Sequence, residues 1–501
     1  MKIASAAAIR AAEQQLFAQG RISSLQLMDA VVRRLAALFS PGQSELADLH
    51  PARVVVYAGK GNNAGDAIGL AAALHLPVTL RSIGGPDSLS ADSRAQLARI
   101  PSSLLSLEKA EPEPHLLILD GLLGSGARGP LRDDIRRLAD ELNTLRDVSP
   151  RSLTLAIDLP TGLDAADGQA DPSAIRADIS CPIGCVKPGM LADGASAFVG
   201  RLLPVALPEV TLAESAEAPE AQAYAGTVLA DAALMRGWLP RRSYDCFKNR
   251  AGRVAIVAGS IGMLGAAQLA AEAALQAGAG LVCLYCLPDA YPILAARVAP
   301  EIMVRPVESY AEIDEAQAQA LLIGPGLGNK LPPAEREALH RLASDFRGSV
   351  VLDADGLNIA AADAWQPQRH WILTPHPGEM RRLCPDAPTD RLACVRHYRA
   401  LHPATLLLKG SRSIIAGDEV IAYNSSGGPC MASGGQGDVL SGVIAALAAQ
   451  GLCPWRAAVM GAWACGQAAL LAQMRRGRTR AVPAGNVIGC VGEALAMLAV
   501  S

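Results

Sequence analysis

The stretch RVVVYAGKGNNAGDAIGLAAALHL, residues 53–76, decides the fold of the first half of the chain. Its opening residues are mostly β-branched and favour a buried strand, whereas its Ala- and Leu-rich end favours a helix. Gly59, Gly61 and Gly65 lie between these parts and predict a loop that admits a phosphate or the edge of a cofactor. A strand that passes through such a loop into a helix is the building unit of α/β proteins.

Three more strand-like runs follow, PVTLRSI near 77–83, HLLILDG near 115–121 and LTLAIDL near 153–159. Helical stretches rich in Ala and Leu separate them. Strands that alternate with helices predict a parallel sheet covered on both faces, so we expect a Rossmann-like α/β/α domain. Ligands of such sheets bind at the carboxyl ends of the strands, which is where polar residues become candidates for a site.

The second half of the chain repeats this pattern, beginning with GRVAIVAGS at 252–260. It continues with LVCLYCL, ALLIGPGLG, SVVLDADGL, HWILTPHPGE and ATLLLKGS, and nearly every strand runs directly into Gly, Pro, Asp or His. Ordinary turn residues explain about half of these clusters taken singly. Their presence at successive strand ends predicts one shared site in a second α/β/α domain.

Length and composition also indicate two domains. A chain of 501 residues is too long for one ordinary core, and its 50% apolar and 19% charged residues allow each domain a large one. The segment LAESAEAPEAQA, 212–223, is acidic and lacks an apolar face. We therefore expect it to link a domain of residues 1–211 to a domain of residues 224–501.

The charge and the cysteines exclude several classes of partner. A formal net charge of -3 argues against nucleic acid or an anionic membrane. The eleven scattered cysteines fit a reducing cytoplasm, and Arg10 and Glu13 interrupt the apolar run at the N-terminus, which argues against a signal peptide. No run of about 18 uncharged apolar residues is apparent, so we expect no membrane span. We expect a cytoplasmic homo-oligomer that acts on small molecules.

The stretch NSSGGPCMASGGQGDVLSG, residues 424–442, carries the strongest functional signal. A glycine-rich loop that leads into a helix presents backbone N–H groups to an anion, and the start of the helix adds a partial positive charge. Asp438 lies at this start, where its carboxylate either caps the helix or faces the bound group. An acid beside a phosphate is placed to take a proton from a hydroxyl that attacks a phosphoryl group. The alternative is a glycine-rich turn with an Asp cap.

In the first half, oxygen-bearing side chains follow successive strands. Asn63, Asp120 and Thr161 are expected to converge at the carboxyl edge of the sheet, as an all-oxygen site of low charge. Such a site suits a weakly hydrated monovalent cation better than zinc. Asp158 remains as a candidate acid or base. The alternative is that these acids cap loops or helices.

Three segments of the first half, GKGNNAGDA, DGLLGSG and IDLPTG, resemble in order and spacing the signature segments of NAD(P)H-hydrate epimerase domains. The resemblance implies that Asn63, Asp120 and Thr161 bind potassium and that Asp158 contacts the substrate as the catalytic acid or base. It also implies a set of substrate-binding residues: Asn62, Asn63, Ala64, Gly65, Asp66, Gly124, Ser125, Gly126, Ala127, Arg128, Gly129 and Pro130. Ala64 and Ala67 depart from the family, which has glycines there, and an added methyl at Ala64 is expected to crowd the ligand or strain the backbone.

The second half resembles the ADP/ATP-dependent NAD(P)H-hydrate dehydratases, which have a ribokinase-like fold. GRVAIVAGSIGMLGAAQLAAEAALQAGAGLV, IGPGLG, LDADGLN, TPHPGE, LLKGSRS and GGQGD occur in the family's order. The resemblance implies that the substrate contacts Ala266, Gly326, His376 and Asp438, and that the nucleotide, with Mg²⁺, contacts Lys409, Gly410, Ser411, Arg412, Ser413 and Gly437. For His376 alone, the alternative is a strand-end histidine bonded to backbone. FKNR at 247–250 departs from the family's HKG, although Lys248 keeps the cation.

The implied chemistry fits the residues. Hydrated NAD(P)H carries a hydroxyl on its reduced pyridine ring, and hydroxide is a poor leaving group whereas phosphate is a good one. Asp438 is expected to remove the hydroxyl proton while ADP or ATP transfers its terminal phosphoryl group, after which phosphate leaves. Loss and return of the hydroxyl through a ring cation would interconvert the R and S hydrates, with Asp158 moving the proton.

A second class of function stays open at this point. Ribokinase-like folds with a GxGD loop also include kinases of vitamins and sugars, which leave a stable phosphorylated product. In that case the first half would act as a ligand-sensing module without catalysis. The sequence does not choose between ADP and ATP.

Overall fold

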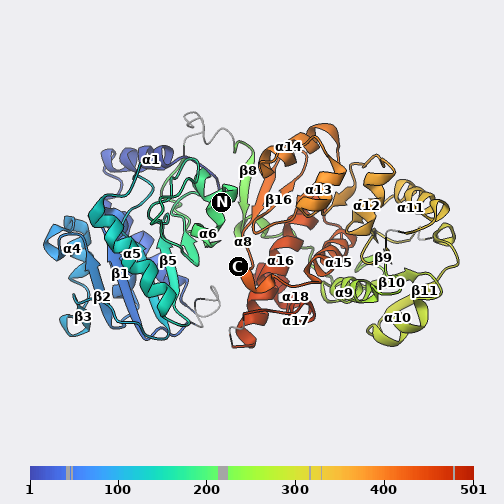
Figure 1. Cartoon of the computed structure of the whole chain (residues 1–501), viewed down its shortest axis with the longest axis horizontal. Helices are drawn as coiled ribbons and strands as arrows, with labels where there is room; N and C mark the ends of the chain where they lie inside the picture. The colour runs from blue at the N-terminus through green and yellow to red at the C-terminus, as the bar shows by residue number, and fades with distance from the viewer. Residues whose placement is uncertain are drawn as a thin grey trace. The chain divides into compact units, whose positions relative to one another are not determined.

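The computed structural model describes residues 1–40, 46, 49–212, 224–314, 317–328, 330–477 and 480–500. The chain divides into two compact units, Met1–Thr227 and Val228–Ser501, which are described separately (Figure 1). Of the expected linker 212–223, residues 213–223 lie outside the described part of the chain.

The first unit is built on a parallel sheet. Within the described residues the sheet has seven strands, in the order β3-β2-β1-β4-β5-β6-β7. The strands are β1 (Arg53–Ala58), β2 (Val78–Ser82), β3 (Leu105–Ser106), β4 (Leu116–Gly121), β5 (Leu153–Ile157), β6 (Ile179–Cys181) and β7 (Arg201–Leu202). The order confirms the Rossmann-like α/β/α expectation, since it reverses between β1 and β4.

Two apolar layers cover this sheet, because alternate residues of each strand point to opposite faces. On one face Val54 and Val56 pack with α2 and α3, and on the other Val55 and Tyr57 pack with α5. The helices of the unit are α1 (Ala6–Ala18), α2 (Ser24–Ala37), α3 (Asn62–Ala73), α4 (Ala91–Leu97), α5 (Asp133–Val148) and α6 (Ser196–Val199).

The second unit has a larger, mixed sheet. Within the described residues it has ten strands, in the order β11-β10-β9-β12-β13-β14-β15-β16-β17-β8. The strands from β9 to β15 run parallel to their neighbours, whereas β16 pairs antiparallel with both β15 and β17. The strands are β8 (Thr227–Ala230), β9 (Arg253–Val257), β10 (Leu281–Cys286), β11 (Ile302–Pro306), β12 (Ala320–Ile323), β13 (Ser349–Leu352), β14 (Trp371–Leu373), β15 (Thr405–Leu408), β16 (Ser413–Ala416) and β17 (Ile421–Asn424).

Helices lie on both sides of this sheet. Figure 1 shows α11–α14 along one side and α9 with α15–α18 along the other, where Ala-rich helices form one continuous core. This arrangement is the expected ribokinase-like α/β/α architecture. The helices are α8 (Ala232–Met235), α9 (Leu264–Gln276), α10 (Tyr291–Arg297), α11 (Pro333–Asp345), α12 (Asp355–Ala362), α13 (Pro377–Leu383), α14 (Arg391–Leu401), α15 (Gln436–Ala449), α16 (Pro454–Arg475), α17 (Ala484–Ile488) and α18 (Val491–Val500).

Helix α16 corrects one expectation. It is long and apolar enough to cross a membrane by length and composition, whereas we expected no such segment. However, 78% of its apolar window is buried inside the protein. Burial against α15, α17 and α18 explains the apolar sequence, because a helix surrounded by other elements is apolar on all sides.

Candidate active sites of the two units

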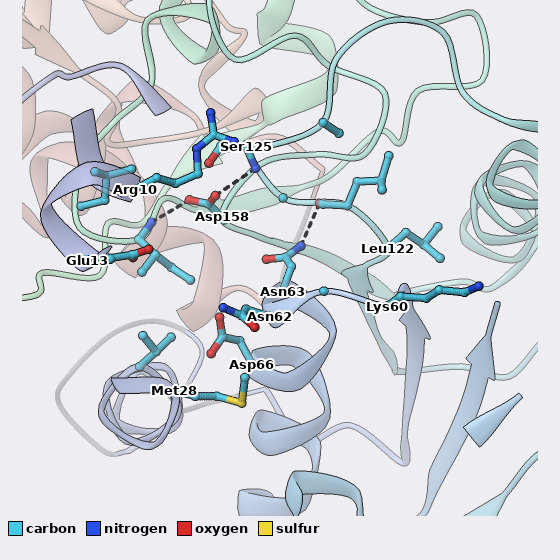
Figure 2. A pocket seen from close by; sticks show the side chains of 18 of the residues that line it. Arg10, Glu13, Met28, Lys60, Asn62, Asn63, Asp66, Leu122, Ser125 and Asp158 are labelled. Atoms are coloured by element: carbon cyan, nitrogen blue, oxygen red, sulfur yellow. Dashed lines mark hydrogen bonds between the residues drawn. The ribbon is translucent and has the colours of Figure 1, made fainter. Parts of the chain in front are cut away.

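The first site lies where the strand order of the first sheet reverses, at the carboxyl ends of β1 and β4. A cavity of about 660 Å³ opens there, and its wall includes the start of α3, the segment after β4 and one side of α1 and α2 (Figure 2). Helix α3 begins at Asn62, so the loop after β1 is shorter than expected and Gly65 belongs to the helix. A Cβ on Gly65 would lie 2.5 Å from the Met28 sulfur, so glycine lets α2 approach α3 closely.

Asn63, Asp120 and Thr161 come together behind this cavity. The Thr161 hydroxyl donates to Asp120 Oδ1 at 2.8 Å and its N–H donates to Oδ2 at 2.7 Å. Asn63 is joined to them through Leu123, whose carbonyl accepts from Asn63 Nδ2 at 2.8 Å and whose N–H donates to Thr161 Oγ1 at 3.0 Å. The three side chains thus surround one backbone segment, as their spacing predicted.

Asp120 is fully buried, and its environment favours a cation nearby. Burial raises the pKa of Asp120 to about 6, although hydrogen bonds from Thr161 and Leu122 act in the opposite direction. A carboxylate that is costly to ionise gains from a neighbouring positive charge. The residues supply oxygen ligands and a single carboxylate, so they fit a monovalent cation better than a divalent one.

Asp158 lies at the end of β5 and is tied into a buried ion pair with Lys187. Its backbone adopts φ +66°, unusual for a residue with a side chain, and this turns the carboxylate toward the cavity. Oδ1 accepts from Lys187 Nζ and from the Ile183 N–H at 3.2 Å, and Oδ2 accepts from the Ser125 N–H at 3.2 Å. Burial opposes ionisation, but Lys187 and these hydrogen bonds outweigh it and lower the pKa of Asp158.

Two other carboxyl groups of the cavity wall interact electrostatically with Asp158. Asp66 on α3 is fully buried, and burial, with the charges of Asp158 and Glu13, raises its pKa well above the ordinary value. Glu13 on α1 is partly buried, and its pKa is raised by burial first and by Asp158 second, while Lys187 and Arg10 lower it. Figure 2 shows Glu13 and Arg10 reaching from α1 toward Asp158 and Ser125.

The structure sorts the expected substrate-binding residues of the first unit into two groups. The cavity wall contains Asn62, Asn63, Asp66, Gly124, Ser125, Gly126, Ala127 and Asp158. It does not include Ala64, Gly65, Arg128, Gly129 or Pro130.

The two alanines of α3 correct another expectation. Ala64 and Ala67 are fully buried in the core under the sheet, where Ala67 packs against Gly121, and neither has a positive φ. The methyl groups therefore neither crowd the cavity nor strain the backbone. An α3 that starts at Asn62 turns both side chains inward, which the loop that we expected would not have done.

The second site gathers around a buried acid that the sequence reasoning left without a role. Asp353 follows β13 and is 1% exposed, and its Oδ1 accepts from Lys409 Nζ at 2.5 Å and from the Thr374 hydroxyl at 2.9 Å. Gly437 lies alongside, since a Cβ on it would lie 3.3 Å from Lys409 Nζ. The ends of β13, β14 and β15 thus meet the start of α15.

Asp438 is the third residue of α15 and does not cap it. The cap position is Gly435, at φ +88°, and no side chain bonds to the helix start. Burial raises the pKa of Asp438 to about 6, and Asp353 and Asp355 act in the same direction while Lys409 acts against them. Asp438 therefore interacts with the charged residues of the site, and its pKa is raised into the range that suits a general base.

His376 begins α13 beside this cluster. Its Nδ1 accepts from the Gly378 N–H at 2.9 Å, and its own N–H donates to Glu379 Oε2 at 2.8 Å. Burial raises the pKa of Glu379, which also feels the charges of Lys409 and Asp353. His376 is thus bonded to backbone, as the alternative to a substrate contact requires. Its side chain is also 53% exposed, so the ring remains accessible.

The remaining expected residues of the second unit come from three loops. Gly326, at φ +63°, lies against α9, because a Cβ on it would lie 3.1 Å from the Cβ of Ala266. The loop 409–412 is fixed by Arg391 at the start of α14, whose Nη2 donates to the carbonyl of Arg412 at 2.8 Å and to that of Lys409 at 3.3 Å. A Cβ on Gly410 would lie 2.5 Å from the same guanidinium, so a larger residue there would displace the Arg391 side chain.

The sequence reasoning missed several residues that the structure places in the two sites. Some had a local signal, since Arg10 and Glu13 lie inside an apolar run and Asp353 directly follows a strand. These residues are Arg10, Glu13, Lys187, Asp353, Asp355, Glu379 and Arg391.

Comparisons with known protein families match both units. Residues 4–189 match the family described as YjeF-related protein N-terminus, and residues 254–488 match the family described as NAD(P)H-hydrate dehydratase. The matched ranges contain the cavity of the first unit and the Asp353–Asp438 cluster of the second.

Solved structures align with the second unit. A ribokinase-like superfamily protein from Enterococcus faecalis is 25% identical with a TM-score of 0.49, and covers 55% of this chain and 98% of that one. The ADP/ATP-dependent NAD(P)H-hydrate dehydratase from Bacillus subtilis, co-crystallised with ATP/Mg²⁺, is 24% identical with a TM-score of 0.45, and covers 54% of this chain and 98% of that one.

Relatives that align along both units are more similar in sequence to this chain than these solved structures are. The bifunctional NAD(P)H-hydrate repair enzyme Nnr of Moorella thermoacetica is 33% identical over 87% of this chain and 86% of its own length. The protein of the same name in Escherichia coli is 32% identical over 89% of this chain and 86% of its own length. Since the identity extends across both units, the chain belongs to the family of bifunctional NAD(P)H-hydrate repair enzymes.

Proposed function

We propose that the chain repairs hydrated NAD(P)H. The first unit interconverts the R and S hydrates, and the second removes the hydroxyl of the S hydrate with an adenine nucleotide and releases phosphate. The observation that carries this proposal is the carboxylate of Asp438 at the uncapped start of α15, beside Lys409 and the buried Asp353.

In the dehydration step, Asp438 takes the proton of the substrate hydroxyl. The hydroxyl oxygen then attacks the terminal phosphorus of the nucleotide, and the bond from that phosphorus to the bridging oxygen breaks. The new phosphoester leaves the ring carbon as phosphate, and loss of a ring proton restores the dihydropyridine. The N–H groups at the start of α15 stabilise the negative charge that develops on the transferred group.

The loop after β15 provides the nucleotide contacts. Lys409 supplies a positive charge next to Gly437, and Arg391 holds the backbone of 409–412 in place for the nucleotide. The described residues contain no group of three His, Cys, Asp or Glu side chains placed to hold a metal. Mg²⁺ would therefore come with the nucleotide phosphates, whose charge it would neutralise.

In the epimerisation step, the substrate ring occupies the cavity near Asp158. The ion pair with Lys187 keeps Asp158 ionised, so it can accept a proton from water that adds to the ring. Asn63, Asp120 and Thr161 would hold potassium, which would supply a fixed positive charge beside the substrate phosphates. The segment 124–127 lines the cavity and would contact those phosphates.

We also propose that the protein acts in the cytoplasm. All eleven cysteines are free and most are buried, which suits a reducing compartment. The homo-oligomer stays a prediction.

An assay with hydrated NADH and ADP or ATP tests the proposal. NADH absorbs at about 340 nm and its hydrate does not, so dehydration is followed directly as recovered absorbance. Recovery with release of one phosphate per NADH is the expected result. A stable phosphorylated product without recovery would instead identify a ribokinase-like small-molecule kinase. Comparing ADP with ATP in the same assay also identifies the phosphoryl donor.

A further inference from the structure

Helix α1 is fixed to the wall of the first cavity by the backbone that precedes it. The Ala4 N–H donates to the Val186 carbonyl at 3.0 Å, and the Val186 N–H donates to the Lys2 carbonyl at 3.1 Å. The side chain of Ser5 then caps the helix by accepting from the Ala8 N–H at 3.1 Å. These bonds place α1 directly beside Lys187, the partner of Asp158.

This anchoring directs one face of α1 into the cavity. Ile9 packs against the turn at Gly184, where a Cβ would lie 2.6 Å from its Cδ1. Glu13 lies one turn further along the helix, so it projects from the same face, and both residues line the cavity. Arg10 reaches the segment after β4, since a Cβ on Gly126 would lie 2.8 Å from its guanidinium.

Four charged groups face Glu13 from the surrounding elements. Arg10 comes from α1 itself, Asp66 from α3, Asp158 from the end of β5, and Lys187 from the segment after β6. Lys187 is committed to Asp158 and to the carbonyls of Ile183 at 3.0 Å and Cys185 at 3.1 Å. Glu13 therefore shares the cavity with a carboxylate that already holds the available ammonium group.

The surroundings of Glu13 and Asp158 displace their pKa values in opposite directions. Burial and the charge of Asp158 raise the pKa of Glu13, whereas Lys187 and the N–H groups of Ser125 and Ile183 outweigh burial and lower the pKa of Asp158. One carboxyl is thus biased toward its acid form and the other toward its ionised form. Two carboxyl groups in one cavity with pKa values displaced in opposite directions are the usual arrangement of a catalytic acid and a catalytic base.

We propose that Glu13 is the general acid of the epimerisation site and acts as the partner of Asp158. The inference rests on the proposed epimerase function of the first unit, because it assigns a residue to that reaction. Asp158 is poorly suited to give the first proton, since its oxygens accept three hydrogen bonds that stabilise the ionised form.

The step balances without an oxidant or a reductant. Glu13 gives its proton to the ring hydroxyl, the carbon–oxygen bond breaks, and water leaves a ring cation whose charge is shared with the ring nitrogen. Water adds to the same carbon from the other face and loses a proton to Asp158, which forms the other epimer. Exchange with solvent returns the proton from Asp158 to Glu13, and the reverse reaction uses the same groups in opposite roles.

The test uses the full chain and a single purified epimer of NADH hydrate without nucleotide, so that the second unit is silent. Formation of the other epimer is followed by NMR in wild type, Glu13→Gln, Glu13→Asp and the control Gln14→Ala, whose side chain is exposed on the same helix. We expect Glu13→Gln to lower the enzymatic rate about 10²- to 10⁴-fold, Glu13→Asp to recover part of it, and the control to match wild type. Thermal melting and dehydration of the S hydrate with ADP report whether each variant folds.

The outcomes separate the inference from the function. If wild type accelerates exchange and folded Glu13→Gln does so equally, the inference is wrong and the epimerase function stands. If wild type itself gives no acceleration, the epimerase function fails and the inference fails with it. If Glu13→Gln lowers the epimerisation rate by the same factor at every pH, the role of Glu13 as general acid is also overturned. A general acid predicts that kcat/KM of wild type falls as pH rises through the pKa of Glu13, and that this fall is absent in Glu13→Gln.

Discussion

Asp438 and Asp158 are both carboxyl groups of the candidate active sites, yet their surroundings displace their pKa values in opposite directions. Asp438 is buried among other acids, and Lys409 is engaged with Asp353. Asp158 has its own lysine and three hydrogen-bond donors. The difference is one of neighbours and not of residue type, so each makes its own prediction for pH and mutation.

Ionised Asp438 should lower the stability of the folded protein, although it supports catalysis. Burial raises its pKa in the folded protein to about 6, from 3.8, so the folded state binds the proton more tightly and stability falls as pH rises from 3.8 to about 6. Asp438→Asn removes this cost, and we expect an unchanged or higher Tm at pH 7 with about 10²- to 10⁴-fold slower dehydration. In wild type the rate should fall as pH drops below about 6. Retained turnover in Asp438→Asn would contradict the assignment of the base.

Lys187 should be essential to the stability of the first unit. Because the pKa of Asp158 is lowered in the folded protein, Asp158 stabilises the fold above pH 3.8, and this stabilisation is lost as pH falls through its folded pKa. Because the pKa of Lys187 is raised, Lys187 stabilises the fold below pH 10.5, and this stabilisation is lost as pH rises through its folded pKa. Lys187→Met leaves the carboxylate of Asp158 without its compensating positive charge, so we expect a loss of about 3–5 kcal/mol in free energy of unfolding. Denaturant titration measures it. The double variant Lys187→Met with Asp158→Asn should lose less free energy of unfolding than Lys187→Met alone. An equal loss in the two variants would show that packing, and not charge, is responsible.

At the scale of elements, the starts of α3 and α15 determine what each site presents. Helix α15 begins after a glycine at φ +88° with no capping side chain, so the N–H groups of its first turn remain available to an anion. Helix α3 also begins without a side-chain cap, at Asn62, and turns Ala64 and Ala67 into the core. The same element that displays Asn62 and Asn63 to the cavity therefore buries the residues that depart from the family.

The placement of α3 predicts the effect of restoring the family's glycines. Ala64→Gly and Ala67→Gly each remove a buried methyl and lower helix propensity, so each should reduce the free energy of unfolding by about 1–2 kcal/mol. The epimerisation rate should stay within about twofold of wild type, because neither methyl lines the cavity. Chemical denaturation and the NMR exchange assay measure the two quantities. A large gain in rate would mean that the methyl groups do obstruct the substrate.

At the scale of the whole molecule, the two sites belong to separate compact units, so a variant in one should leave the other active. Given a mixture of both hydrates and ADP, wild type should recover NADH in a single phase. Asp158→Asn should recover the S share at the normal rate and the R share only at the rate of spontaneous epimerisation. Absorbance at about 340 nm resolves the two phases. A single fast phase in Asp158→Asn would contradict the separate roles of the units.

The strands and the main site residues could be predicted from the sequence, because their signals are local. The runs near 53–59 and 153–159 became β1 and β5, and their carboxyl ends lie where the order of parallel strands requires. Asn63, Asp120 and Thr161 were expected together for the same reason. A polar residue directly after a buried strand is recognisable without knowing the rest of the fold.

Only the tertiary structure decided which charges share a cavity. Glu13 and Asp158 are far apart in sequence, and the pairing of residues 2–4 with Val186 brings them together. In the second unit, Lys409 is paired with Asp353 and only partly offsets the effect of burial on Asp438. Desolvation and Coulomb interactions depend on distances through space, so the sequence determined which acids and bases this protein has, and the fold determined in which direction their pKa values are displaced.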